Sequence, residues 1–221
     1  MLRAHPSAIH TSLAERDGAW LMNGTKSFVT MGVFAQRLVV IASVGTAPDG
    51  RNRLRATMVD AREAGVRMTN NPALAFAPEI PHASVRLTDV PARVLRGDGY
   101  LDYLEPFRTI EDIHVLAATV GWLIRVARVS GWSQAGRQRL LTVVAAVRGL
   151  DFDAPSSPGV HIALGGTFEL FGDVLAELDP LWESTDPTTR RWWERDRPLL
   201  ATVGRVRGQR LVAAWRSVLP N

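Results

Sequence analysis

The run from Arg190 to Arg197 places two adjacent tryptophans among four arginines. Aromatic rings can stack on bases while neighbouring cations contact phosphates, so the run is compatible with single-stranded nucleic acid. The same pattern also suits the end of a helix, with the tryptophans in the core and the arginines reaching outward to water. The residues alone leave both alternatives open.

Positive charge is concentrated in this same region. The chain of 221 residues has a net charge of +4, and residues 186–221 carry eight arginines against three acidic residues, a local charge of +5. Such a surface is either a solvated helix face or a patch for phosphates of a nucleotide cofactor or a nucleic acid. A basic nucleic-acid module is therefore a minor alternative, and the composition is otherwise that of an ordinary globular protein.

Residue types and spacings exclude several catalytic centres. The chain has no cysteine, which excludes disulfides, thiolate metal sites and a cysteine nucleophile. Its five histidines are scattered without the spacing of a metal site, so we expect no metal. No serine lies in the G-x-S-x-G context of a hydrolase. Glycine-rich dinucleotide and Walker phosphate-binding patterns are also absent.

The sequence predicts no membrane span, because it contains no apolar run of about 18 residues. The longest candidate, Val115 to Ile124, is too short and ends at Arg125. The segment from Met1 to Pro6 lacks the apolar core of a signal peptide. The absence of cysteine fits a cytoplasmic location, which we expect.

The elements that position functional residues differ between the two halves of the chain. Residues 8–96 contain short alternating or β-branched runs separated by turn residues, a pattern typical of a small antiparallel barrel or sandwich. Asp17-Gly18 is the strongest hairpin signal. We predict a β-domain over residues 1–100, already truncated where the chain begins.

Helical periodicity predominates from Glu105 onward, so residues 101–221 are predicted to form an antiparallel helical bundle and the fold class to be α+β. Thr109 and Asp112 resemble a capping box at the start of the first helix. Loops are expected over Asp151–Gly159 and Asp179–Pro187. Further helices are expected over Ser133–Arg148, His161–Leu178 and Pro198–Val218.

The segment from Trp20 to Gly32 resembles a motif of the middle β-domain of acyl-CoA dehydrogenases, W-x-(L/I)-N-G-x-K-x-(W/F)-(I/V)-(T/S)-x-G. The segments Leu38–Ala42, Val85–Pro91 and Gly97–Tyr100 are also similar to that family. The matching residues of the motif are Trp20, Asn23, Gly24, Lys26, Phe28, Val29, Thr30 and Gly32, with Leu21 or Met22 at the aliphatic position.

The resemblance implies an FAD cofactor and names residues that would bind it. Phe28 falls where the family has an aromatic residue against the flavin ring, and Thr30 falls where a hydroxyl and an amide face its N5 edge. Val29 lies between them in the motif. Ser7 matches the last polar residue of a preceding loop that contacts the flavin. Without the resemblance, Phe28 is a core aromatic and Thr30 an ordinary strand residue.

Glu111 is the catalytic candidate implied by the resemblance. It matches a helix pattern, E-R-x-x-x-A-x-x-x-x-G, with Gly121 ten residues later, and in isovaleryl- and long-chain-specific members this glutamate is the catalytic base. Asp112 replaces the family's arginine. The simpler explanation is a helix-favouring acid in a first turn, paired with Arg108 on the surface.

The family's activity would be oxidation of an acyl-CoA thioester to the 2,3-enoyl form, with electrons passed to an electron-transfer flavoprotein. The family's N-terminal helical domain and its Q-x-x-G-G-x-G flavin motif are missing here. Leu164–Phe168 is a weak echo of that motif, and its two glycines equally suit close helix packing. The alternative is therefore a non-catalytic truncated member acting in assembly, as a homo-oligomer or with a partner chain that supplies the missing domain.

Overall fold

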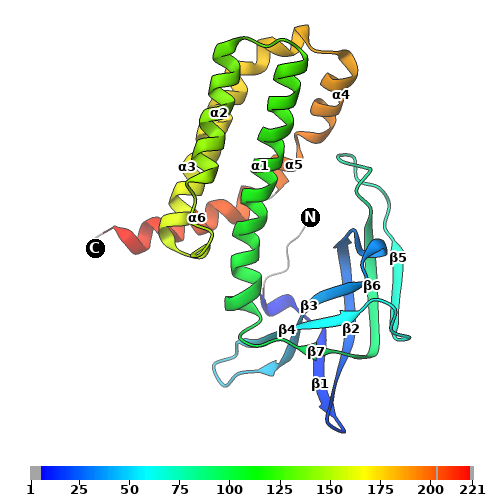
Figure 1. Cartoon of the computed structure of the whole chain (residues 1–221). Helices are drawn as coiled ribbons and strands as arrows, with labels where there is room; N and C mark the ends of the chain where they lie inside the picture. The colour runs from blue at the N-terminus through cyan, green and yellow to red at the C-terminus, as the bar shows by residue number, and fades with distance from the viewer. Residues whose placement is uncertain (1–5, 203, 220–221) are drawn as a thin grey trace. The chain divides into compact units, whose positions relative to one another are not determined.

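The computed structural model describes residues 6–202 and 204–219 and divides the chain into two compact units, Met1–Glu105 and Pro106–Asn221. The first is a β-unit and the second is helical (Figure 1). The α+β fold class expected from the change of periodicity is confirmed.

The β-unit is one seven-stranded sheet in the order β5-β6-β2-β1-β3-β4-β7, curled into a half-barrel. All its neighbouring strands are antiparallel except β1 and β3, which pair in parallel at Ser12 and Ser43. The strands are β1 Ser12–Arg16, β2 Ala19–Thr30, β3 Arg37–Thr46, β4 Asn52–Asp60, β5 Val66–Asn70, β6 His82–Pro91 and β7 Arg93–Val94. Short 3-10 turns, η1 Pro6–Ala8 and η2 Gly32–Phe34, precede β1 and follow β2.

The predicted hairpin at Asp17-Gly18 joins β1 to β2, with Arg16 opposite Ala19. Both turn residues have positive φ, 51° and 77°, the backbone of the two-residue turns that match strand twist. Apolar side chains on the inner face of the sheet form its core, with Met22 and Val90 completely buried. The hairpin thereby fixes the register of β2, the strand that carries the motif.

The helical unit is built on three long helices, α1 Glu105–Val129, α2 Gln134–Arg148 and α3 Pro158–Leu178. A π-helical turn, η3 Tyr100–Leu104, leads into α1. Side chains at 140, 143 and 147 on α2 meet buried side chains of α1 and α3 in one core. The remaining elements are η4 Asp179–Ser184, α4 Pro187–Asp196, α5 Leu199–Thr202 and α6 Gly204–Val218.

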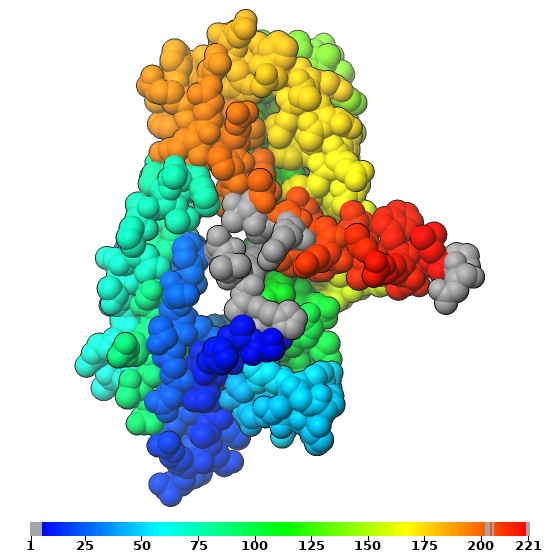
Figure 2. Space-filling model, turned by 180° about the vertical axis from the view of Figure 1, so that it is seen from behind, coloured from blue at the N-terminus to red at the C-terminus, as the bar shows by residue number. Residues whose placement is uncertain are grey.

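α6 packs closely on α3 at Gly165, where an added Cβ would lie 2.8 Å from Cδ2 of Leu211. Gly165 therefore serves helix packing, the alternative to a flavin motif that its sequence context left open. The other face of α6 is apolar yet exposed, with Val212, Trp215 and Val218 each about half accessible. α6 is the red helix of Figure 2.

Two sequence-based predictions are wrong in this unit. The first helix begins at Glu105 rather than at Thr109, so Thr109 and Asp112 lie inside α1 and cap nothing. The segment Asp179–Pro187, expected to be a loop, is mostly the 3-10 turn η4. Within residues 6–202 and 204–219, no helix is long and apolar enough to cross a membrane.

Candidate functional site

The first polar residue of the motif, Asn23, closes a bulge between β2 and β6. Its amide Nδ2 donates to Oδ1 of Asp89 at 2.9 Å, and its Oδ1 accepts from the backbone N–H of Asp89 at 2.9 Å. Asp89 has a positive φ of 47° at the point where the register between the strands shifts. Asn23 therefore stabilises an irregular backbone, and it is a structural residue of the motif.

Lys26 on β2 is the only lysine of the chain. Its side chain reaches past the end of the short strand β1 to the neighbouring strand β3. Its Nζ donates to the carbonyl of Ile41 on β3 at 2.8 Å. Burial lowers the pKa of Lys26 from its ordinary value of 10.5 to about 8. Lys26 thus joins β2 to β3 at the cost of placing a cation in a poorly solvated position.

This burial predicts a pH dependence of stability. The unfolded chain binds the Lys26 proton up to about pH 10.5 and the folded chain only up to about 8, so stability rises with pH between these values. Between pH 7.5 and 9.5 we expect the wild type to gain on the order of 1 kcal/mol more than K26M. Urea unfolding at the two pH values measures this gain, and equal gains in both proteins would contradict the prediction.

The end of β2 is bent by a second register shift. Lys26 faces Val85 and Val29 faces Ala83, so Ser27 and Phe28 share one opposing residue on β6. The carbonyl of Ser27 is bound by side chains instead of the ladder: Asn71 Nδ2 donates to it at 2.9 Å and Ser84 Oγ at 3.2 Å. Bulges of this kind redirect a side chain next to functional sites.

Phe28 is stacked on His82, with ring centroids 4.0 Å apart and an angle of 28° between the planes. Thr30 lies directly opposite His82 in the sheet and is exposed. Val29 packs with the sheet core instead. The structure therefore brings Phe28, Thr30 and His82 to one face, while the Val29 side chain lies on the other.

His82 is the part of this face that the sequence did not indicate. It is 8% exposed, its Nδ1 has no hydrogen-bond partner in the described chain, and burial lowers its pKa. The ring is therefore neutral at pH 7 and offers one unused polar atom beside an aromatic surface. Only its pairing position opposite Thr30, which depends on the bulge, brings it there.

Large apolar side chains surround the end of β2. Met31 has a positive φ of 57° and turns the chain into η2. The exposed residues are Met31, Val33, Phe34 and Ile80, with Phe34 71% accessible. Contiguous exposed apolar patches can mark surfaces that bind a ligand or another protein. We call these four residues the apolar rim.

Ser7 is held at another part of the β-unit. It lies in η1, which is anchored on β4 by the Asn52 amide: Nδ2 donates to the carbonyls of Pro6 at 3.1 Å and Ile9 at 3.0 Å. The Ser7 residue itself is exposed. Its assignment to a cofactor stays a prediction.

Glu111, the candidate base, is half-buried on α1 in the helical unit. The next residue, Asp112, is completely buried and paired with Arg210 of α6. Thr109, one turn earlier, is also completely buried. Thr109 and Asp112, which resemble a helix cap in the sequence, therefore lie on the buried face of α1. Glu111 lies at the edge of this buried face.

Further hydrogen bonds connect the Asp112–Arg210 pair to Thr109 and His161. Arg210 donates to Thr109 Oγ1 at 2.7 Å, and the Thr109 hydroxyl lies 3.3 Å from Nε2 of His161 on α3. Burial and Arg210 both lower the pKa of His161, which favours its neutral ring. The network joins α1, α3 and α6. In the described residues no group of three or more His, Asp or Glu side chains could hold a metal.

Comparison with solved structures identifies the architecture. A glutaryl-coenzyme A dehydrogenase in complex with glutaryl-CoA is 15% identical with a TM-score of 0.60, over 96% of this chain and 63% of that one. An acyl-CoA dehydrogenase from Geobacillus kaustophilus is 17% identical with a TM-score of 0.66, over 98% and 66%. The chain has the acyl-CoA dehydrogenase fold.

Within this fold the chain consists of a β-domain and a helical domain, as the resemblance predicted. The FMN-bound dibenzothiophene monooxygenase TdsC from Paenibacillus sp. A11-2 is also similar, at 15% identity and a TM-score of 0.69, over 94% of this chain and 67% of that one. The chain spans about two thirds of the length of these proteins. No family model and no curated protein matches the sequence.

Proposed function

We propose that this protein is a flavin-dependent oxidoreductase of the acyl-CoA dehydrogenase type. The observation that supports this most is the face at the end of β2, where the bulge places Phe28 on His82 and where Thr30 lies beside them. A rigid aromatic pair suits contact with a planar ring, and the exposed Thr30 hydroxyl suits a hydrogen bond to the edge of that ring. The similarity of the fold to both acyl-CoA dehydrogenases and an FMN-bound monooxygenase adds support.

The proposed cofactor is FAD, held by Phe28 and Thr30, with the Val29 backbone and Ser7 as further contacts. When bound, FAD would supply the acceptor for the hydride that leaves the β-carbon of an acyl-CoA thioester. Glu111 takes the α-proton, so that the product is the 2,3-enoyl thioester and the carboxylate becomes a carboxylic acid. The proposed partner that would receive the electrons is an electron-transfer flavoprotein.

Flavin binding is the direct test. Titration with FAD and with FMN, followed by flavin fluorescence, should show binding of at least one of them. F28A should weaken that binding about tenfold, since an aromatic contact contributes roughly 0.5–1.5 kcal/mol. F152A, at a half-exposed aromatic position of the helical unit, is the matched control and should bind flavin normally. Equal affinities of F28A and wild type would remove Phe28 from the site.

Glu111 is tested by turnover. With a panel of acyl-CoA thioesters and an artificial electron acceptor, E111Q should lose activity at least about a hundredfold while it retains flavin, because general bases contribute about 10²–10⁴ in rate. D151N, a change to an exposed acid outside the helices, is the control. Retained turnover in E111Q would show that another group takes the proton.

A second candidate is an assembly protein without catalysis, favoured by the apolar rim of four exposed residues. It requires that neither FAD nor FMN binds and that the protein forms an oligomer or captures a partner chain through this rim. Size-exclusion chromatography with light scattering, run beside the flavin titration, distinguishes the two candidates. A flavin-free monomer would argue against both.

A further inference from the structure

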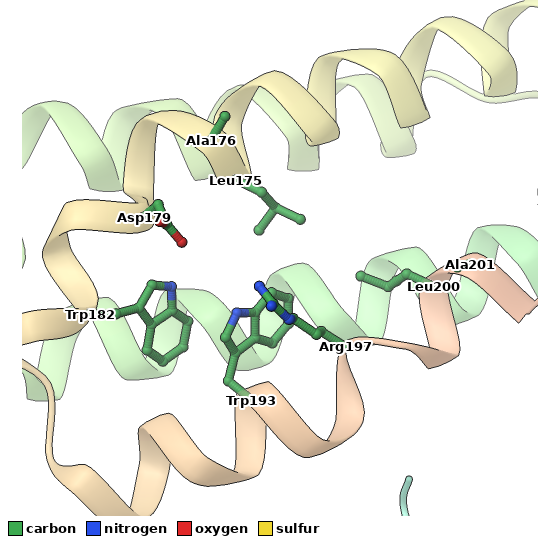
Figure 3. Close-up of a pocket in the computed structure, with 8 residues that line it drawn as sticks. All are labelled: Leu175, Ala176, Asp179, Trp182, Trp193, Arg197, Leu200 and Ala201. Carbon is green, nitrogen blue, oxygen red and sulfur yellow. The ribbon is translucent and has the colours of Figure 1, made fainter.

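The helical unit contains a cavity of about 350 Å³ at the C-terminal end of α3. Residues of α3, η4, α4 and α5 line it, and it is open to solvent on one side (Figure 3). Its volume lies at the lower end of the range of small-molecule sites, about 300–1,000 Å³. The side chains that define its chemistry are Leu175, Asp179, Trp182, Trp193, Arg197 and Leu200.

One wall of the cavity is a rigid aromatic stack. The rings of Trp182 and Trp193 are nearly parallel, with centroids 5.5 Å apart and planes at 7°. Trp122 of α1 stacks on both, at 6.2 and 6.0 Å. Because each indole is held by the others, this wall is already formed before any ligand binds, which lowers the cost of binding.

Two opposite charges face this apolar wall. In Figure 3 the Asp179 carboxylate and the Arg197 guanidinium both point into the cavity, from opposite sides. Among the residues described, neither side chain makes a hydrogen bond or an ion pair. They do not pair with each other either.

Two neighbouring arginines already have acidic partners. Arg190, which has a minor electrostatic interaction with Asp179, is bound to Glu194 at 2.8 Å, and Arg195 is bound to Asp196 at 2.7 Å. Asp179 and Arg197 are the charged residues that line the cavity. Both residues are exposed to solvent.

A ligand that satisfies all three features carries an anion for Arg197, a cation for Asp179 and an apolar body for the indoles and leucines. A simple carboxylic acid can pair only with Arg197, and a simple amine only with Asp179, so each makes one of the two possible charge-assisted contacts. We propose that this cavity binds a free α-amino acid with an apolar side chain. Its carboxylate pairs with the guanidinium and its ammonium with the carboxylate.

This site uses none of the residues assigned to flavin or acyl-CoA, so its test is independent of the test of the proposed function. The cavity belongs entirely to the helical unit. It is an additional ligand site, of the size and polarity that suit a metabolite.

The first test compares matched ligands on the full chain by isothermal titration calorimetry. L-Leucine and L-phenylalanine should bind. Two leucine analogues, 4-methylpentanoate without the ammonium and 3-methylbutylamine without the carboxylate, should bind at least about tenfold more weakly, since each loses one charge-assisted contact. No heat with either amino acid, or equal binding of 4-methylpentanoate, would overturn the proposal.

The second test locates the site. R197Q and D179N should each weaken L-leucine binding at least about tenfold, because each removes one charged partner. R191Q, at an exposed position of α4 where Arg191 bonds to Thr188, is the matched control. Circular dichroism confirms that all three variants are folded. Wild-type affinity in both R197Q and D179N would overturn the assignment.

Discussion

D112A should lower the free energy of unfolding by about 3–5 kcal/mol, the effect of removing one partner from a buried ion pair. Asp112 is completely buried and the Arg210 side chain is 14% exposed, so the remaining guanidinium would be charged with little access to water. Thr109 would still accept one of its hydrogen bonds but cannot neutralise it. Urea unfolding followed by circular dichroism measures the loss.

Two further variants separate this effect from simple loss of packing. In the double variant D112L/R210M both charges are replaced by apolar side chains, which should recover most of the stability, because burying two charges costs about as much as their attraction returns. E177Q breaks the exposed Arg139–Glu177 pair and should leave the unfolding midpoint almost unchanged. A D112A protein as stable as E177Q would contradict the proposed role of the pair.

Asp112 also shows where sequence analysis fails. Thr109 and Asp112 have the spacing of a capping box, and nothing local distinguishes that from two polar residues turned inward. Their partner, Arg210, lies 98 residues further along the chain and becomes visible only when α6 is placed beside α1. The actual turn before α1 depends on Asp98, whose carboxylate accepts from the N–H groups of Tyr100 and Leu101 at 2.8 Å.

The β-unit was more accessible to prediction, because its signals are local. Asp17-Gly18 is short enough to dictate a hairpin by backbone geometry alone, and alternation then sets which residues face the core. Phe28 and Thr30 follow on one face for the same reason. The bulge at Ser27 could not be inferred, because it depends on the side chains of Asn71 and Ser84 from other segments. The bulge shifts the register of β2 on β6 and so places His82 opposite Thr30, which is why the sequence did not indicate His82.

W193A is the second change with a large expected effect, a loss of about 3–5 kcal/mol. Trp193 is 8% exposed and stacks on Trp182 and Trp122, so alanine would leave a cavity between α1, η4 and α4. Its neighbour in the chain, Trp192, is 49% exposed. W192A should therefore change stability by no more than about 0.5 kcal/mol. Urea unfolding of the two variants measures the difference.

This pair of variants also decides between the two alternatives that the Arg190–Arg197 run left open. A single-stranded nucleic-acid surface needs its aromatic rings accessible for stacking, so W193A would then weaken oligonucleotide binding without a large loss of stability. A helix packed on the core gives the opposite result, a large loss of stability at Trp193 alone. Trp193 stacks on Trp122 and Trp182 and is therefore part of the core. Of the two tryptophans in this run, Trp192 is the exposed one on which a base could stack. Equal stabilities of W193A and W192A would contradict this assignment.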